Sequence, residues 1–378
     1  MTDTPRVFAS ANNFEENWRE NADALARDLA GAEGTLGILY TAESFAPHLD
    51  GMLAVLREKT GIAAWAAAAG YGVIAAGEEH FGIPGAAALV LDLPASGYRL
   101  FSGGADTGER LAANHADWIA EAAMPLALAH VDPRHRDAMT AVEEMATHTG
   151  GFLIGGLTAA SGEAPHQAGG AVKAGAGCLS GVAFSPLAVE MATALSQGCT
   201  PLGEAHTVTQ AQDNILIELD SRPALDVMIE EIGPELAADL RRIGGIVFAA
   251  LPVPGSDTAD YTVRNLVGLD PEHKAVAIAQ VVPEGDPVLF CRRDRDSAVE
   301  DMRRMTGDLK RRVGNRPIRG GLYISCAARG PNQFAAPDRE TDIIRETLGD
   351  FPMAGFFANG EISRDRIYAY TGVLTLFL

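Results

Sequence analysis

Two short segments near the C-terminus contain the side chains best suited to hold a polar ligand. Cys326 and Arg329 follow one apolar segment, and Asn359, Gly360 and Glu361 follow another. A guanidinium offers two parallel donors to a carboxylate, and a glutamate can pair with an amine. With the Asn359 amide to orient both groups, these residue types predict a site for an amino-acid-like zwitterion. The alternative is a structural pair between Arg329 and Glu361.

Further candidates lie outside these two segments. Arg264 occurs in an otherwise apolar segment, where a lone arginine is costly unless it bonds an acid such as Asp257 or Asp260, or lines a pocket. Gly77 and Glu78 repeat the Gly-Glu pair of the C-terminal segment. A glycine-rich turn after a strand can direct N–H groups at an anion, although glycine also marks tight turns that bind nothing. No loop has the spacing of a nucleotide-binding motif, so nucleotide binding is rejected.

Cysteine catalysis is one alternative to ligand binding. As a nucleophile, Cys326 would need a lowered pKa and a histidine base. After residue 222 the chain contains one histidine, His273, within an apparent Asp-Pro-Glu-His turn. A buried structural thiol is the better interpretation, and the sequence therefore predicts that the protein is not an enzyme.

Metal or haem binding would require ligand residues in characteristic settings. The four cysteines show neither a CxxC pair nor Cys/His ligand spacing, so no metal site is predicted. A haem would need an axial histidine in an apolar pocket, and His80 and His166, which follow Gly-Glu loops, are the candidates. A histidine after a turn is usually only solvated, so no cofactor is predicted, with haem as the alternative.

Internal repetition indicates which elements position these residues. A strand, a helix, a second strand and a Gly-Glu loop occur in this order three times, with first strands at 36–40, 126–130 and 321–326 and loops at 72–78, 156–163 and 355–361. Such units are βαβ crossovers with parallel strands. Because loops 72–78 and 355–361 share a Gly-apolar-apolar-Ala-x-Gly-Glu pattern, we expect them to be equivalent.

Strand candidates outside the repeats outnumber the helices. Residues 87–93 with 97–101, and 171–177 with 179–184, are typical of antiparallel hairpins, and further strands are expected throughout 187–291 and at 368–376. The predicted fold class is α+β with α/β-like βαβ units: mixed β-sheets covered by helices, in two related domains with internal repeats. We expect an N-terminal strand and helix extension at 1–32, one domain at 33–222 and a second at 223–378.

Charge and hydropathy limit the partners. The net charge of −20 excludes the cationic surface that nucleic acids or anionic membranes require. The longest weakly polar stretch, 61–77, is shorter than a membrane span, and the N-terminus does not have the order of a signal peptide. A cytoplasmic location is expected.

Several motifs together resemble the FIST family of signal-sensing modules, over roughly residues 33–374. They lie at 155–163, 197–203, 207–211, 214–220, 222–225, 261–266 with Asp270, 325–330 and 354–362. One departure is the loop at 72–78, where the family more often has Cys-Ser-Thr. The resemblance implies an N-terminal and a C-terminal FIST domain and the sensing of a small ligand such as an amino acid.

The resemblance also bears on the output of such a sensor. The sequence is similar to nitric-oxide-sensing haemoproteins built on FIST domains and to F-box adaptors that carry them, but no F-box precedes residue 33. The FIST-like region fills the chain without a kinase, methyl-accepting or cyclase segment. A stand-alone sensor is therefore expected, acting through a separate signalling protein such as a histidine kinase or cyclase.

Overall fold

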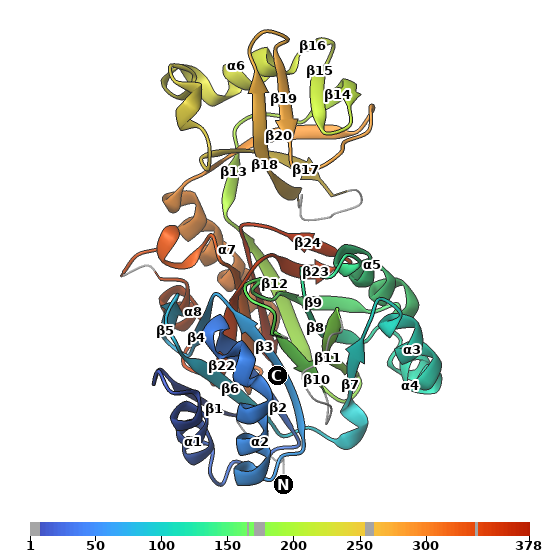
Figure 1. Ribbon diagram of the computed structural model, residues 1–378, viewed down its shortest axis with the longest axis vertical. Helices are drawn as coiled ribbons and strands as arrows, with labels where there is room; N and C mark the ends of the chain where they lie inside the picture. The colour runs from blue at the N-terminus through green and yellow to red at the C-terminus, as the bar shows by residue number, and fades with distance from the viewer. Residues whose placement is uncertain (1–7, 165, 170–177, 254–260, 337–338) are drawn as a thin grey trace. The chain divides into compact units, whose positions relative to one another are not determined.

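The computed structural model describes residues 8–164, 166–169, 178–253, 261–336 and 339–378. The chain forms two compact units. Unit 1 contains residues 1–196 and 302–378, and unit 2 contains residues 197–301, so unit 2 is an insertion in the sequence of unit 1 (Figure 1). Helices occur together with sheets of mixed strand direction, which confirms the predicted α+β fold class.

Unit 1 contains three βαβ crossovers, as the repeats predicted. In each crossover two strands lie side by side in parallel, and a helix connects them. The crossovers are β2 (Leu36–Ala42), α2 (Leu49–Thr60) and β3 (Ala64–Gly70) in module A; β8 (Leu126–Val131), α5 (Ala138–Thr149) and β9 (Phe152–Leu157) in module B; and β21 (Gly320–Cys326), α8 (Glu340–Leu348) and β22 (Met353–Ala358) in module C.

Each module adds two strands and one or two helices to its crossover. A first strand and a helix precede the crossover, and a last strand pairs antiparallel with the crossover's first strand. These elements are β1 (Ala9–Asn13), α1 (Trp18–Asp28) and β6 (Ala86–Leu91) in module A; β7 (Tyr98–Gly103), α3 (Thr107–Asn114), α4 (Ala116–Ala122) and β11 (Leu179–Phe184) in module B; and β12 (Met191–Gln197), α7 (Arg295–Val313) and β25 (Thr371–Phe377) in module C. Unit 2, which includes the first residues of α7, is inserted between β12 and the rest of α7, where the other modules have a short connection.

The three modules exchange strands in a ring. After its crossover, each module sends one strand into the sheet of another module: β4 (Gly72–Ala75) pairs with β22, β10 (Gln167–Gly169) with β3, and β23 (Glu361–Arg364) with β9. Three backbone hydrogen bonds at equivalent positions mark the exchange: Tyr71 N to Phe357 O, Asn359 N to Leu157 O, and Ala159 N to Ala69 O, each 2.9 Å. Unit 1 therefore has a pseudo-threefold arrangement.

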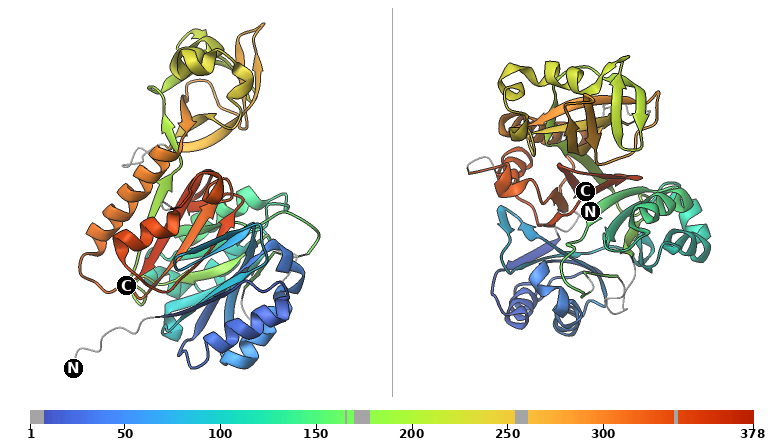
Figure 2. Two further views of the ribbon diagram at one scale, coloured as in Figure 1. Left: turned by 90° about the vertical axis from the view of Figure 1, so that its left-hand side faces the viewer. Right: turned by 45° about the horizontal axis from the view of Figure 1, so that its top comes forward.

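The sheets enclose one central core and carry helices on their outer faces. Inward-facing residues at equivalent positions of the crossovers, such as Ile38, Leu128 and Leu322, meet in the central core. Figures 1 and 2 show α1 and α2 over the sheet of module A, and their apolar residues form a second core with it. Helices α3 and α5 cover module B in the same way. In module C, α7 reaches the sheet where the Tyr323 hydroxyl contacts Met302 Sδ.

The structure corrects the expected equivalence of the two Gly-Glu loops. Gly77 lies in the turn between β4 and β5 (Glu78–Phe81), whereas Gly360 lies between β22 and β23. The strand pairings make Gly72 the counterpart of Gly360, and Val73 the counterpart of Glu361. The shared seven-residue pattern is displaced by five residues relative to the structural repeat, because β3 of module A consists mostly of alanine and lacks a distinctive motif.

One predicted hairpin is also wrong. Strands β6 and β7 lie in the sheets of different modules, where they pair with β2 and β11 respectively. For the other hairpin, residues 171–177 lie outside the described part of the chain, while β11 lies between β7 and β8. The local sequence therefore predicted strands β6, β7 and β11 but not the strands with which they pair.

Unit 2 is a closed antiparallel barrel of six strands with α6 (Ala224–Ala237) packed against its core, as Figure 2 shows in yellow to orange. The strands follow one another around the barrel as β20 (Pro287–Arg293), β14 (His206–Gln212), β15 (Ile215–Leu219), β19 (Ala275–Ile278), β18 (Tyr261–Asp270) and β17 (Val247–Pro252), which returns to β20. The short strands β13 (Cys199–Pro201) and β16 (Arg222–Pro223) extend it. The expected boundary at 222 lies inside this unit, so the compact units and the predicted sequence domains divide the chain differently.

Gly156 offers a test of how tightly the modules interlock. A Cβ atom there would lie 2.7 Å from Ala358 Cβ and 3.0 Å from Ile324 Cγ2, both in module C. We expect Gly156→Ala to lower the free energy of unfolding by about 1–3 kcal/mol, because the packed neighbours cannot retreat. Gly104→Ala is the control, since its Cβ would meet only Asp106 Oδ1 at 3.5 Å. Equal urea midpoints for the two variants would contradict the tight packing.

Candidate functional site

The ends of β21 and β22 bring four of the predicted site residues together. These strands are parallel, so the segments that follow Cys326 and Ala358 leave from the same end of the sheet of module C. A hydrogen bond of 2.8 Å from Ala327 N to Ala358 O joins the segments. Such strand ends are where open α/β sheets tend to bind ligands. Cys326, Arg329, Gly360 and Glu361 all lie in this region.

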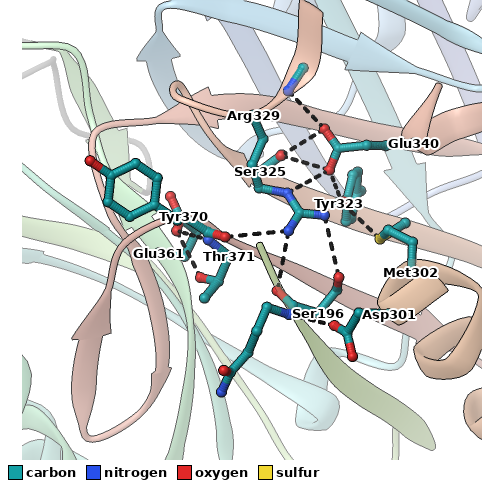
Figure 3. A network of polar contacts seen from close by, with 12 residues as sticks. Ser196, Asp301, Met302, Tyr323, Ser325, Arg329, Glu340, Glu361, Tyr370 and Thr371 are labelled. Atoms are coloured by element: carbon teal, nitrogen blue, oxygen red, sulfur yellow. Dashed lines mark hydrogen bonds and ion pairs between the residues drawn. The ribbon is translucent and has the colours of Figure 1, made fainter. Parts of the chain in front are cut away.

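Arg329 is fully buried and lies at the centre of a polar network (Figure 3). Its Nε donates to Glu340 Oε1 at 2.9 Å. Its Nη1 donates to the carbonyl oxygens of Tyr370 at 3.3 Å and Ser196 at 3.5 Å, and Nη2 donates to Ser196 Oγ at 3.3 Å. The acid that pairs with Arg329 is therefore Glu340, and not Glu361 as the sequence suggested for a structural pair.

Glu340 is the first residue of α8 and is also fully buried. Besides Arg329, its carboxylate accepts hydrogen bonds from the Tyr323 hydroxyl, from Ser325 Oγ at 2.9 and 3.0 Å, and from Gly330 N at 3.1 Å. A buried ion pair is tolerated when such bonds satisfy the remaining polar atoms. This pair therefore fixes the segment between β21 and α8.

Glu361 is the second fully buried acid of the region, and it is only half satisfied. Its Oε2 accepts hydrogen bonds from Thr371 Oγ1 at 2.7 Å and Thr371 N at 3.1 Å. Its Oε1 makes no hydrogen bond of ordinary length and angle among the described residues, and the neighbouring Cys326 thiol offers the carboxyl only a weak donor. Burial raises the pKa of Glu361 to about 8, although the Thr371 bonds and the Arg329 charge act in the opposite direction. Most of the population is therefore protonated at neutral pH.

The Cys326 thiol lies beside the Glu361 carboxyl. Burial raises the pKa of Cys326, and the negative charge that Glu361 can carry raises it further. A nucleophilic cysteine needs the opposite shift, because the thiolate is the reactive species. This environment is typical of a structural thiol.

Tyr370 completes the region and carries backbone strain. Its φ is 64°, in the left-handed region that residues other than glycine seldom occupy. Its carbonyl accepts from Arg329, and the next residue, Thr371, binds Glu361. The two contacts hold the strained peptide from both sides, and strained backbone of this kind often occurs at functional sites.

The remaining predicted site residues lie elsewhere. The Asn359 side chain is exposed, while its backbone N–H takes part in the strand exchange. Gly77 and Glu78 lie at the β4–β5 turn, where Glu78 accepts a bond of 2.9 Å from Asn12 Nδ2. Arg264 is on β18 of unit 2 and donates to Gln280 Oε1 at 2.5 Å. Its expected partners, at positions 257 and 260, lie outside the described residues.

The two haem candidates differ in their surroundings. The His80 ring stacks on Phe14 with centroids 3.4 Å apart and lies 3.5 Å from Glu78. His166 is buried, and burial followed by the Arg134 charge lowers its pKa, while the Ala164 backbone acts in the opposite direction. Over the described ranges, no group of three or more histidine, cysteine or acidic residues is placed to hold a metal ion.

Sequence reasoning missed several buried polar residues. Glu340 resembled a surface residue at a helix start, and Ser196 carried no signal. His130 and Tyr40 occupy equivalent positions of modules B and A, with His130 Nε2 3.2 Å from the Tyr40 hydroxyl. Burial lowers the pKa of His130 to about 3, so this imidazole is neutral. A histidine within an otherwise apolar strand was the signal that could have marked this pair.

The FIST N domain model matches residues 35–222, and the FIST C domain model matches residues 224–364. The chain belongs to the FIST family. FIST domains are sensory domains of signal transduction. The two FIST matches meet inside the barrel of unit 2, so the barrel and the ring of modules each draw on both.

Mycobacterial proteins are among the relatives of this FIST protein. The uncharacterized protein MT0656 of Mycobacterium tuberculosis (strain CDC 1551 / Oshkosh) is 34% identical over 194 residues, which cover 49% of this chain and 50% of the relative. The uncharacterized protein Mb0898c of Mycobacterium bovis is 34% identical over 195 residues, with the same coverage. The chain thus spans about half the length of the curated relatives it matches. Its described helices include none with the length and hydropathy to cross a bilayer.

The Arg329–Glu340 pair of this FIST protein can be tested by removing the cation. We expect Arg329→Met to cost about 3–5 kcal/mol in unfolding free energy, because Glu340 would remain buried without its counterion. Adding Glu340→Gln should recover a large part of that loss. The control is Arg345→Met, whose half-exposed pair with Asp342 should contribute less than about 1 kcal/mol. A loss of the same size in Arg329→Met and Arg345→Met, measured by guanidinium denaturation, would refute the structural role.

Glu361 predicts a pH dependence of stability. Its pKa rises from 4.5 to about 8 on folding, so the folded state binds the proton more tightly, and stability falls as the pH rises from 4.5 through 8. Within this window, each rise of one pH unit should lower the free energy of unfolding by about 1.4 kcal/mol through Glu361. Glu361→Gln cannot ionise and should match the wild type near pH 5 but exceed it at pH 9. Parallel unfolding curves for the two proteins across this range would exclude the shift.

Proposed function

We propose that this FIST protein senses a small polar ligand of the amino-acid type at the ends of β21 and β22. The observation that carries the proposal is the half-satisfied Glu361 carboxyl, which is fully buried and has one oxygen without a hydrogen bond of ordinary length and angle among the described residues. A buried polar atom without a hydrogen bond costs about 1–3 kcal/mol. A ligand that donates to Oε1 would remove this cost.

The surroundings favour an amine as the group that Glu361 binds. A ligand ammonium supplies both N–H donors and the positive charge that stabilises a carboxylate. The pKa of Glu361, raised to about 8 by burial, means that the acid must lose its proton to form this pair at pH 7. Ligand binding would therefore release close to one proton. Of the groups that face Glu361, Thr371 keeps its two bonds, and Cys326 stays a neutral thiol.

Arg329 suits the carboxylate of the same ligand. Its Nη1 contacts with the Tyr370 and Ser196 carbonyls, at 3.3 and 3.5 Å, are long for N–H···O bonds. A carboxylate would offer a shorter, charge-assisted bond to this nitrogen while Nε stays on Glu340. Because Arg329 and Glu361 are fully buried, a ligand can enter only if neighbouring residues move. Next to Arg329 and Glu361, the strained Tyr370 is one such residue, and β24 (Arg366–Tyr368) pairs with β23, which begins at Glu361.

The output of the sensor is a further part of the proposal. A stand-alone cytoplasmic protein of this family would act through a separate signalling protein, such as a histidine kinase or cyclase. The sensory role of FIST domains supports this part.

Calorimetry can test the ligand chemistry. Free L-amino acids are first screened by thermal shift, and any binder is titrated at pH 7 in buffers of different ionisation enthalpy. We expect release of close to one proton per ligand, and affinity that rises up to tenfold per pH unit below pH 8. Glu361→Gln should weaken binding by about 1.5–3 kcal/mol, or roughly ten- to a hundredfold.

The matched control is Glu43→Gln. Glu43 follows β2 of module A and accepts a bond of 2.6 Å from Ser161, away from Glu361. The Glu43→Gln variant should bind the amino acid as tightly as the wild type does. Unchanged affinity in Glu361→Gln, or the absence of any shift with amino acids, would reject the proposal.

A further inference from the structure

The chain passes between the two units at two places, and both lie at the Arg329 network. Ser196 is the last residue of unit 1 before the insertion, and Met302 is the first residue after it. Both are fully buried. Ser196 is near the end of β12, and Met302 is in α7, so each connection leaves through a regular element.

Two branches of the network hold these residues. Arg329 contacts the carbonyl and the hydroxyl of Ser196, and the Tyr323 hydroxyl contacts Met302 Sδ at 3.5 Å. Glu340 binds both Arg329 and Tyr323, so one carboxylate connects the branches. One residue beyond each crossing point, Gln197 N donates to Asp301 Oδ2 at 2.6 Å.

The other end of the network is Glu361. Thr371 binds the Glu361 carboxyl, and the carbonyl of the preceding residue, Tyr370, accepts from Arg329. The φ of Tyr370, 64°, is a strained arrangement that these contacts hold, so the loss of either contact would favour its relaxation. Coupling between sites needs such a two-state element.

We infer that the contacts from Glu361 through Tyr370 and Arg329 to Ser196 and Met302 transmit occupancy of the Glu361 carboxyl to the two connections of unit 2. The inference rests on the proposed function for the identity of the signal. Thermodynamic linkage then makes the effect mutual: a ligand at Glu361 changes the order of the connections, and a change at the connections alters ligand affinity.

Hydrogen exchange of the protein without ligand tests the coupling independently of ligand identity. Thr371→Val removes the hydroxyl bond to Glu361 with little change in size. Because Thr371 is in β25, which pairs with β12, residues 193–199 can respond to this substitution directly, and residues 300–304 of α7 are the decisive peptide. We expect amide exchange in peptides covering residues 193–199 and 300–304 to become about five- to thirtyfold faster, as the loss of one buried hydrogen bond allows. Ser196→Ala removes the hydroxyl contact with Arg329 directly, and its effect on the exchange rates is the reference for the size of the Thr371→Val effect.

Glu43→Gln serves again as the control, and it should leave both peptides unchanged. Unchanged exchange of residues 300–304 in Thr371→Val would overturn the inference, and so would an equal response in Glu43→Gln. Because no ligand is added, failure here is distinguishable from failure of the amino-acid proposal, which the calorimetric proton count decides.

Discussion

The exchange of strands between modules is the constraint on which the rest of unit 1 depends. No module completes its own sheet: β10, β23 and β4 each come from a neighbour and cover the edge of a crossover. An uncovered edge would leave a row of buried backbone groups without partners, which is costly. The close approach of backbones at the exchange points explains the glycines and alanines there. Gly156, for example, lies against both Ala358 and the carbonyl of Gly360.

The same constraint creates the electrostatics of the candidate site. Strand β23 reaches module B by passing the end of β22, and this path places Glu361 in the interior next to Gly156. At the equivalent positions of the other modules stand Val73 and Gln167, which cannot ionise. One module thus carries a buried acid at a position where its counterparts are neutral. Its one nearby cation, among the described residues of the network, is already bound to Glu340.

The sequence predicted what local patterns determine. The recurring order of strand, helix, strand and Gly-Glu loop predicted the crossovers, and the grouping of Cys326, Arg329, Gly360 and Glu361 followed from two parallel strands. Contacts between residues that are distant in the sequence leave no local pattern from which they could be predicted. Glu340 and Arg329 find each other only because α8 packs on β21, and the closure of the barrel depends on the β17–β20 pairing. The sequence repeat was also misaligned by five residues, because the alanine-rich β3 offers no distinctive motif and a similar pattern follows it.

The contact between Phe8 and Phe377 closes the ring at the one place where covalent continuity is absent. Their rings lie 5.6 Å apart, edge to face, just before β1 and at the end of β25. The corresponding junctions, from β6 to β7 and from β11 to β12, are short loops. An aromatic contact thus joins modules C and A where a loop joins A to B and B to C, so the third junction of the ring depends on noncovalent contacts alone.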